Sequence, residues 1–226
     1  MKKLTINWIR HGVSCGNIRN LSNYFNFNIY SKIDPSLFPE SITTTMYIKK
    51  HIPKSVSSNK LILCSQLSRA IETAILMFPE HFKKKKIKII FNVNELGLGI
   101  SQVKQKNNKL KISLRKFIKS IIKNEDFNSF YKFKLSDVDK IEDLFVHIES
   151  NNNINNYKNV YQEILELCSN YKVDNINIVS HSHFIKNKIL FRNDVEFLKK
   201  EKYIDDKNSY LNYFRNKSKK LQLQIL

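Results

Sequence analysis

The sequence predicts an α/β protein with a mainly parallel central sheet, helices on both faces and a helical cap insertion. Short apolar runs that suit buried strands alternate with longer stretches of helical spacing, and the connections between them are short. The 226 residues suffice for one large α/β domain, and a hydrophobic content of 42% supports a packed core. We therefore expect a single domain over residues 1–226, in which residues 101–150 form the cap insertion.

Apolar runs are expected to form the strands. The first has the clearest period, because Leu4, Ile6 and Trp8 alternate with polar residues. The run at 60–64 is apolar almost throughout, as a strand covered on both faces is. The strands are expected at 4–9, 60–64, 87–93, 175–180, 210–214 and 221–226.

Stretches of helical spacing separate these runs. In the clearest one the apolar residues form a single stripe behind Ser65, which can cap the helix. Pro53 and Pro79 are expected to stop the first two helices. The helices are expected at 42–52, 67–78, 110–122, 126–134, 157–171 and 184–191.

The composition limits the classes of partner. A formal net charge of +19 favours anionic partners, which are nucleic acid, anionic lipid or a phosphorylated substrate. The excess is nearly all lysine, so AT-rich codons are an alternative source of the charge. Three widely spaced cysteines match neither a zinc site nor a disulfide framework, and no apolar run approaches the ~18 residues of a membrane span. We expect a cytoplasmic protein that does not enter membranes, with a nuclear location left open.

Unusual polar residues stand where strands end. Arg10 and His11 follow the first strand, Arg69 lies one turn into a helix, and Glu95 and His181 follow later strands. Ligands of α/β sheets bind at the carboxyl ends of strands. A cation near a helix N-terminus opposes the helix dipole, so a bound anion between the two would explain Arg69. The alternative is a surface arginine paired with Glu72.

The sequence around each of these strand-end residues forms a short motif, and the motifs follow one another along the chain. The set comprises Arg10-His11-Gly12 with Ser14 and Asn17, then Ser65–Ala74, Asn94-Glu95-Leu96 and Val179-Ser180-His181, with Asp34-Pro35-Ser36-Leu37 and Asn208-Ser209 as weaker members. In this order the motifs resemble those of the histidine phosphatase superfamily, the phosphoglycerate mutase-like family. The sequence departs from the family pattern at Ser41 and Ser182, where glycine is usual. A Leu-Gly-Leu-Gly run follows Glu95 in place of the mutases' basic and aromatic run, which puts mutase activity in doubt.

The resemblance implies a mechanism without a metal or any other cofactor. His11 would attack phosphorus and form a phosphohistidine. Arg10, Arg69 and His181 would bind the phosphoryl oxygens, and Glu95 would act as general acid and then as general base. The remaining residues expected to bind substrate are Gly12, Ser14, Asn17 and Ser182.

The predicted function is therefore a metal-independent phosphatase that hydrolyses a phosphomonoester. The substrate would be a phosphorylated small molecule or a phosphoprotein, nucleic acid would bind at most nonspecifically, and the oligomeric state stays open. One alternative is a phosphoglycerate mutase-type phosphotransferase. Another is a basic module that binds nucleic acid or a phosphorylated partner through a vestigial site.

Other tempting residues have ordinary interpretations. His183 forms a His-x-His pair with His181, but no third metal ligand is in view. The remaining histidines, at 51, 81 and 147, are expected at the surface. Lys111, Arg115 and Lys119 recur every four residues on one helix face, which either meets a polyanionic substrate or is simply solvated.

Overall fold

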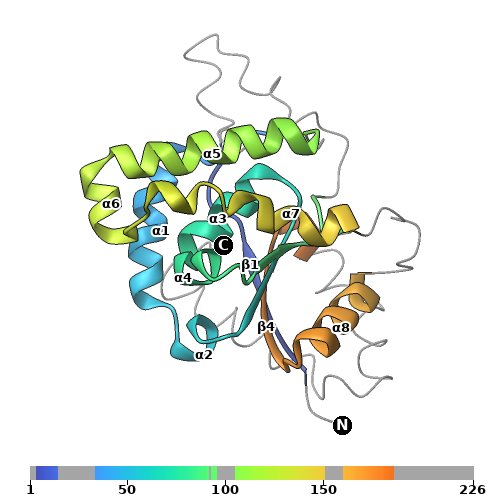
Figure 1. Ribbon diagram of the computed structural model, residues 1–226. Helices are drawn as coiled ribbons and strands as arrows, with labels where there is room; N and C mark the ends of the chain where they lie inside the picture. Colours follow the sequence, from blue (N-terminus) through green and yellow to red (C-terminus); the bar gives the residue numbers. More distant parts are fainter. Residues whose placement is uncertain (1–3, 15–33, 92, 96–104, 151–159, 186–226) are drawn as a thin grey trace.

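A four-stranded parallel sheet forms the centre of the protein, which confirms the predicted fold class. The computed structural model describes residues 4–14, 34–91, 93–95, 105–150 and 160–185. Its strands are β1 (Thr5–Arg10), β2 (Leu61–Cys64), β3 (Ile87–Ile89) and β4 (Asn175–Ser180), in the spatial order β1-β4-β2-β3 (Figure 1). The strands expected at 210–214 and 221–226 lie outside the described residues.

Helices connect and cover these strands. They are α1 (Pro39–His51), α2 (Lys54–Ser57), α3 (Ser68–Met77), α4 (Pro79–Lys83), α5 (Asn107–Lys123), α6 (Glu125–Tyr131), α7 (Ile141–Ser150), α8 (Val160–Tyr171) and α9 (Ser182–Phe184), with a 3₁₀ turn at Leu135–Asp137. Pro79 ends one helix, as expected, but it also begins α4, because the first turn of a helix needs no N–H from its first residue. The helix expected at 184–191 begins two residues earlier, and residues 186–191 lie outside the description.

Two hydrophobic clusters cover the two faces of the sheet. On β2, Ile62 and Cys64 face the cluster that contains α3, whereas Leu61 and Leu63 face the one that contains α8. This alternation follows from the period of a strand, whose successive side chains point to opposite faces. Figure 1 shows α8 on the opposite side of the sheet from α3 and α4. Helices on both faces are thus confirmed.

The helices between 105 and 150 join the main core. The apolar side of α5 lies in the same cluster as α3, and α7 packs along β3. The basic face of α5 matches the solvated interpretation at Lys119, which is exposed, but not at Lys111 and Arg115. Lys111 is largely buried and pairs with Glu142 and Glu149 of α7 at 2.7 and 2.9 Å, and Arg115 also pairs with Glu142. Part of this face therefore holds two helices together.

Two of the histidines expected at the surface are at least partly buried. The side chain of His147 is 10% exposed, and its Nε2 lies 3.0 Å from the buried carboxylate of Glu163. Nε2 of His81 lies 2.5 Å from the carbonyl oxygen of Asn59. Their sequence neighbours are polar or charged, so these contacts with remote residues were not predictable from local pattern. No helix within the described ranges is long and apolar enough to cross a membrane.

The strand ends bring remote residues together. The backbone N–H of His11 donates to Ser180 O at 2.9 Å, and the N–H of Ser65 donates to Val179 O at 2.9 Å. These bonds continue the pairing of β1 and β2 with β4 by one residue. His11, Ser65 and His181 consequently lie next to one another at the carboxyl edge of the sheet.

Candidate active site

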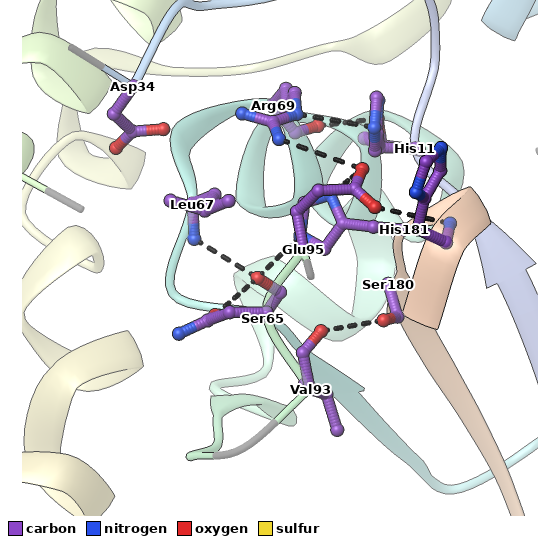
Figure 2. A network of polar contacts seen from close by, with 12 residues as sticks. His11, Asp34, Ser65, Leu67, Arg69, Val93, Glu95, Ser180 and His181 are labelled. Atoms are coloured by element: carbon purple, nitrogen blue, oxygen red, sulfur yellow. Dashed lines mark hydrogen bonds and ion pairs between the residues drawn. The ribbon is translucent and has the colours of Figure 1, made fainter. Parts of the chain in front are cut away.

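Four of the five predicted catalytic side chains meet at this edge (Figure 2). The ring centroids of His11 and His181 lie 4.8 Å apart, and Arg69 Nε lies 3.2 Å from His11 Nε2. Glu95 Oε2 lies 3.6 Å from His181 Nδ1 and 3.9 Å from Arg69 Nη2. The fifth, Arg10, ends β1, and its Nε is buried with no hydrogen-bond partner among the described residues. Its charge nevertheless acts on both His11 and Glu95. With the guanidinium of Arg69 inside the cluster and that of Arg10 beside it, against one carboxylate, the site suits an anion.

The hydrogen bonds of His11 fix the position of its proton. Its Nδ1 lies 2.6 Å from the carbonyl oxygen of Gly12, which can only accept, so Nδ1 carries the hydrogen. Nε2 then holds a lone pair, which accepts from Arg69 Nε–H. Burial lowers the pKa of His11 well below 6.5, and the nearby charge of Arg69 lowers it further. His11 is therefore a neutral imidazole at neutral pH, with Nε2 as its nucleophilic atom.

Arg69 is held at the start of α3 and is only 4% exposed, so it is not a surface arginine. The carboxylate of Asp34 accepts from the N–H and the hydroxyl of Ser68, at 2.7 and 2.9 Å. Its negative charge offsets the unfavourable position of a cation at a helix N-terminus. Burial raises the pKa of Asp34 to about 6, against the bonds from Ser68 and the charge of Arg69.

Glu72 lies one turn further along α3 and serves a different contact. Its Oε2 accepts from the N–H of Leu37 at 2.6 Å, and the side chain is fully buried. Burial raises the pKa of Glu72 to about 8. At neutral pH this carboxyl is thus mostly protonated, and it anchors the segment before α1 rather than neutralising Arg69.

Glu95 lies within this cluster, next to both Arg69 and His181. Its Oε1 accepts from the backbone N–H of His183 at 3.1 Å, which leaves Oε2 toward Arg69 and His181. Burial raises the pKa of Glu95, while the charges of Arg69 and His183 oppose the rise. A carboxyl with a raised pKa suits a general acid near neutral pH.

The four residues expected to bind substrate have different surroundings. Gly12 N–H donates to Thr73 Oγ1 at 2.9 Å, and a Cβ on Gly12 would lie 3.3 Å from Leu37 Cδ2. Ser14 is buried and forms an isolated antiparallel β-bridge with Leu37. Ser182 is the first residue of α9, directly after His181. Asn17 lies outside the described residues. Substrate contacts of these four residues stay predictions.

Sequence reasoning missed two supports of the site. Thr73 accepts from Gly12 N–H and donates to Arg69 O at 2.7 Å, so it joins the two arginine motifs. Asn94 Oδ1 lies 2.7 Å from Ser65 Oγ. Ser65 Oγ in turn lies 2.7 Å from His181 Nε2 (Figure 2). Both residues stand inside the quoted motifs, but only the folded chain shows their partners.

The cluster also contains potential metal ligands. One ligand atom each from His11, Glu95 and His181 lies within 4.8 Å of the others. A metal ion there would compete with Arg69 for the lone pair of His11 Nε2 and would be repelled by two guanidinium groups. The same charges attract a phosphoryl group, which we regard as the better fit. His183 is not part of this group among the described residues.

Comparison with known proteins gives structural likenesses only. No protein-family model matches the sequence, and no curated protein matches it. Solved structures that resemble the chain include a phosphoglycerate mutase from Bacillus anthracis, with 18% identity, a TM-score of 0.42 and coverage of 85% of this chain and 81% of that one. A putative alpha-ribazole-5'-P phosphatase from Escherichia coli has 19% identity, a TM-score of 0.41 and coverage of 82% and 79%. A phosphoserine phosphatase from Entamoeba histolytica has 21% identity, a TM-score of 0.39 and coverage of 82% and 77%.

These structures are phosphoglycerate mutase-like histidine phosphatases, the family that the sequence motifs resemble. At such identities and TM-scores the likenesses carry no argument about activity. The functional conclusion rests on the geometry of the site.

Proposed function

We propose that the protein is a metal-independent phosphatase that hydrolyses phosphomonoesters through a phosphohistidine on His11. The observation that carries the proposal is the state of His11, a buried neutral imidazole with Nδ1–H held by Gly12 O and the Nε2 lone pair against Arg69. A nucleophile must be unprotonated, and the group it attacks must be held by cations. Both conditions are met at His11 Nε2, which is unprotonated and lies 3.2 Å from Nε of Arg69.

The reaction divides into two balanced steps. In the first, His11 Nε2 forms a bond to phosphorus while the bond from phosphorus to the ester oxygen breaks, and Glu95 gives its proton to the leaving alcohol. In the second, water attacks phosphorus, Glu95 takes a proton from it, and the N–P bond breaks to release inorganic phosphate. Arg10, Arg69 and His181 bind the charged oxygens in both steps.

The substrate class follows from this chemistry. A phosphomonoester of a small molecule or of a protein offers the dianionic group that the two arginines can bind. Mutase activity would need a second acceptor site, and the Leu-Gly-Leu-Gly run that weighs against it lies outside the described residues. A vestigial binding module would bind phosphate without turnover, so the same assay separates it from the phosphatase. A cytoplasmic location remains part of the proposal.

The test is turnover of p-nitrophenyl phosphate with and without EDTA. The wild-type protein should release p-nitrophenol in both conditions, and His11→Ala should lose turnover, because no nitrogen then accepts the phosphoryl group. His51→Ala is the matched control, since His51 is an exposed histidine at the end of α1. Loss of activity on chelation, or an active His11→Ala, would overturn the proposal.

A further inference from the structure

His181 has one ring nitrogen bound and one without a partner. The residue is fully buried, and its Nε2 lies 2.7 Å from Ser65 Oγ. Its Nδ1 is a buried atom with no hydrogen-bond partner among the described residues, 3.6 Å from Glu95 Oε2. Among the described residues, the contact with Ser65 Oγ is the one hydrogen bond of the ring, so this contact orients it.

The donors and acceptors around Ser65 determine which atom carries the hydrogen between Ser65 and His181. The backbone N–H of Gln66 donates to Asn94 Oδ1 at 3.0 Å, which identifies this amide atom as the oxygen. Ser65 Oγ, 2.7 Å from the same oxygen, must then use its only hydrogen to donate to it. Ser65 Oγ also accepts from Leu67 N–H at 3.2 Å, so its hydroxyl has no hydrogen left for His181. The hydrogen between the two residues must therefore be on His181 Nε2.

We propose that Ser65 and Asn94 are positioning residues that hold His181 in the Nε2–H tautomer and turn its Nδ1 toward the phosphoryl group. The inference rests on the proposed function for the identity of that group. Because Nε2 always carries a hydrogen, Nδ1 can donate to a phosphoryl oxygen only when the ring is cationic, the form that a bound phosphoryl dianion favours. In the opposite tautomer, a neutral ring would direct Nε2's lone pair against the Ser65 oxygen.

The two ring nitrogens have opposite roles in His181 and His11. At His11 a backbone carbonyl holds Nδ1–H and leaves Nε2 toward Arg69, whereas at His181 a side-chain pair holds Nε2–H and leaves Nδ1 toward Glu95. A carbonyl can only accept, but a hydroxyl can do either, so Ser65 alone would not decide the tautomer. Asn94 removes this ambiguity by taking the hydroxyl hydrogen. This explains why an amide oxygen directly before Glu95 is bound to the strand end of β2.

The test measures the tautomer directly and the rate alongside it. Nitrogen-15 spectra of the imidazole rings, recorded where His181 is neutral, separate Nδ1–H from Nε2–H forms, and His181→Gln assigns its signals by difference. Wild type should show Nε2–H at His181 and Nδ1–H at His11. Ser65→Ala and Asn94→Leu should populate the other tautomer of His181. They should lower kcat/KM for p-nitrophenyl phosphate by at least ~10-fold, the size of effect typical of groups that orient a reactive histidine.

Two further variants separate positioning from packing. Ser65→Thr keeps the hydroxyl and should restore both the tautomer and most of the rate. Ser180→Ala removes another buried hydroxyl, which donates to Val93 O at 2.6 Å rather than to the ring, and should leave the His181 tautomer unchanged. If Ser65→Ala does not fold, Asn94→Leu and the wild-type spectrum still test whether Ser65 and Asn94 set the His181 tautomer.

The outcomes also distinguish this inference from the proposed function. An Nδ1–H form of His181 in active wild-type protein would overturn the inference alone. So would wild-type tautomer and kcat/KM in Ser65→Ala or in Asn94→Leu. Wild-type protein without turnover would overturn the proposed function, while the spectra would still decide the tautomer.

Discussion

In the proposed mechanism, His11 acts as the nucleophile and Glu95 as the proton donor. Burial lowers the pKa of His11 well below 6.5, so the nucleophile stays neutral until the solution is distinctly acidic. Burial raises the pKa of Glu95, so its acid form persists to higher pH than in an exposed glutamate. The two shifts open a pH window in which a neutral base and a protonated acid coexist, which is the state that ester cleavage needs.

This division predicts the pH profile on an alkyl phosphate. The rate should fall as pH rises through the pKa of Glu95, because the acid form is lost, and fall again at low pH only when His11 is protonated. Glu95→Gln should weaken the alkaline limb, leaving the part that comes from loss of the cationic form of His181, and lower kcat by ~10²–10⁴-fold, with a smaller loss on p-nitrophenyl phosphate, whose leaving group needs no proton. Glu80→Gln, an exposed glutamate on α4, is the control. Equal losses on both substrates, with bond cleavage rate-limiting, would contradict the acid role.

At the residue scale the sequence predicted which side chains meet at the candidate site but not the residues that support them. His11, Arg69, Glu95 and His181 were identifiable because each follows a strand or begins a helix in a recurring order. The bonds that orient them join residues far apart in the chain, with 116 positions between His181 and Ser65. A side-chain contact of that range depends on the register of the strands, which local pattern does not contain.

At the scale of the elements, α3 is the main support of the site. It carries Arg69, Glu72 and Thr73, and every residue of the helix is buried. Its first turn is bound by Asp34, and its second turn holds the backbone of Leu37 through Glu72. One helix thus connects the anion-binding arginine to the segment that packs beside Gly12.

Glu72 makes the stability of this support depend on pH. Its pKa is about 8 in the folded protein and near 4.5 when unfolded, so the folded state binds more protons between those values. Unfolding free energy should therefore decrease as pH rises through this range, by at most about 1.4 kcal/mol per pH unit, and level off above pH 8. Glu72→Gln keeps an uncharged acceptor for Leu37 N–H and should flatten the decrease.

The measurement is urea unfolding at pH 6.5 and 8.5, a range above the pKa of about 6 of Asp34. Wild type should lose stability between the two values, Glu72→Gln should lose less, and Glu166→Gln, an exposed glutamate on α8, should behave as wild type. A decrease of the same size in Glu72→Gln would show that another group is responsible.

The elements themselves were largely predictable. The strands at 60–64 and 175–180 and the helix at 67–78 were found to within a residue or two, since a buried parallel sheet and an amphipathic helix have strong patterns. No helix was expected at α2, α4 or α7, although α7 lies inside the predicted helical insertion. α2 and α4 are too short to show a repeated helical period. The ion pairs between α5 and α7 were missed because they need the angle at which two helices pack.

At the scale of the whole molecule, the sheet lies between two hydrophobic clusters and carries the candidate site at its carboxyl edge. His11 and His181 directly follow strands that are paired by backbone hydrogen bonds, so the spacing between these two side chains is set by the sheet. The net charge of +19 adds a field that attracts anions of every class. Phosphorylated substrates and loosely bound nucleic acid would both respond to it, and only the site distinguishes them.

The central claim is that His11 carries the phosphoryl group during turnover. Acid-quenched samples would destroy a phosphohistidine, so the reaction with p-nitrophenyl phosphate should be quenched in base and the protein digested and analysed by mass spectrometry. We predict a phosphoryl group on His11 that is stable to base, labile to acid and absent from His11→Ala. Turnover that leaves His11 unmodified, with the phosphoryl group on another residue or on none under single-turnover conditions, would contradict the account.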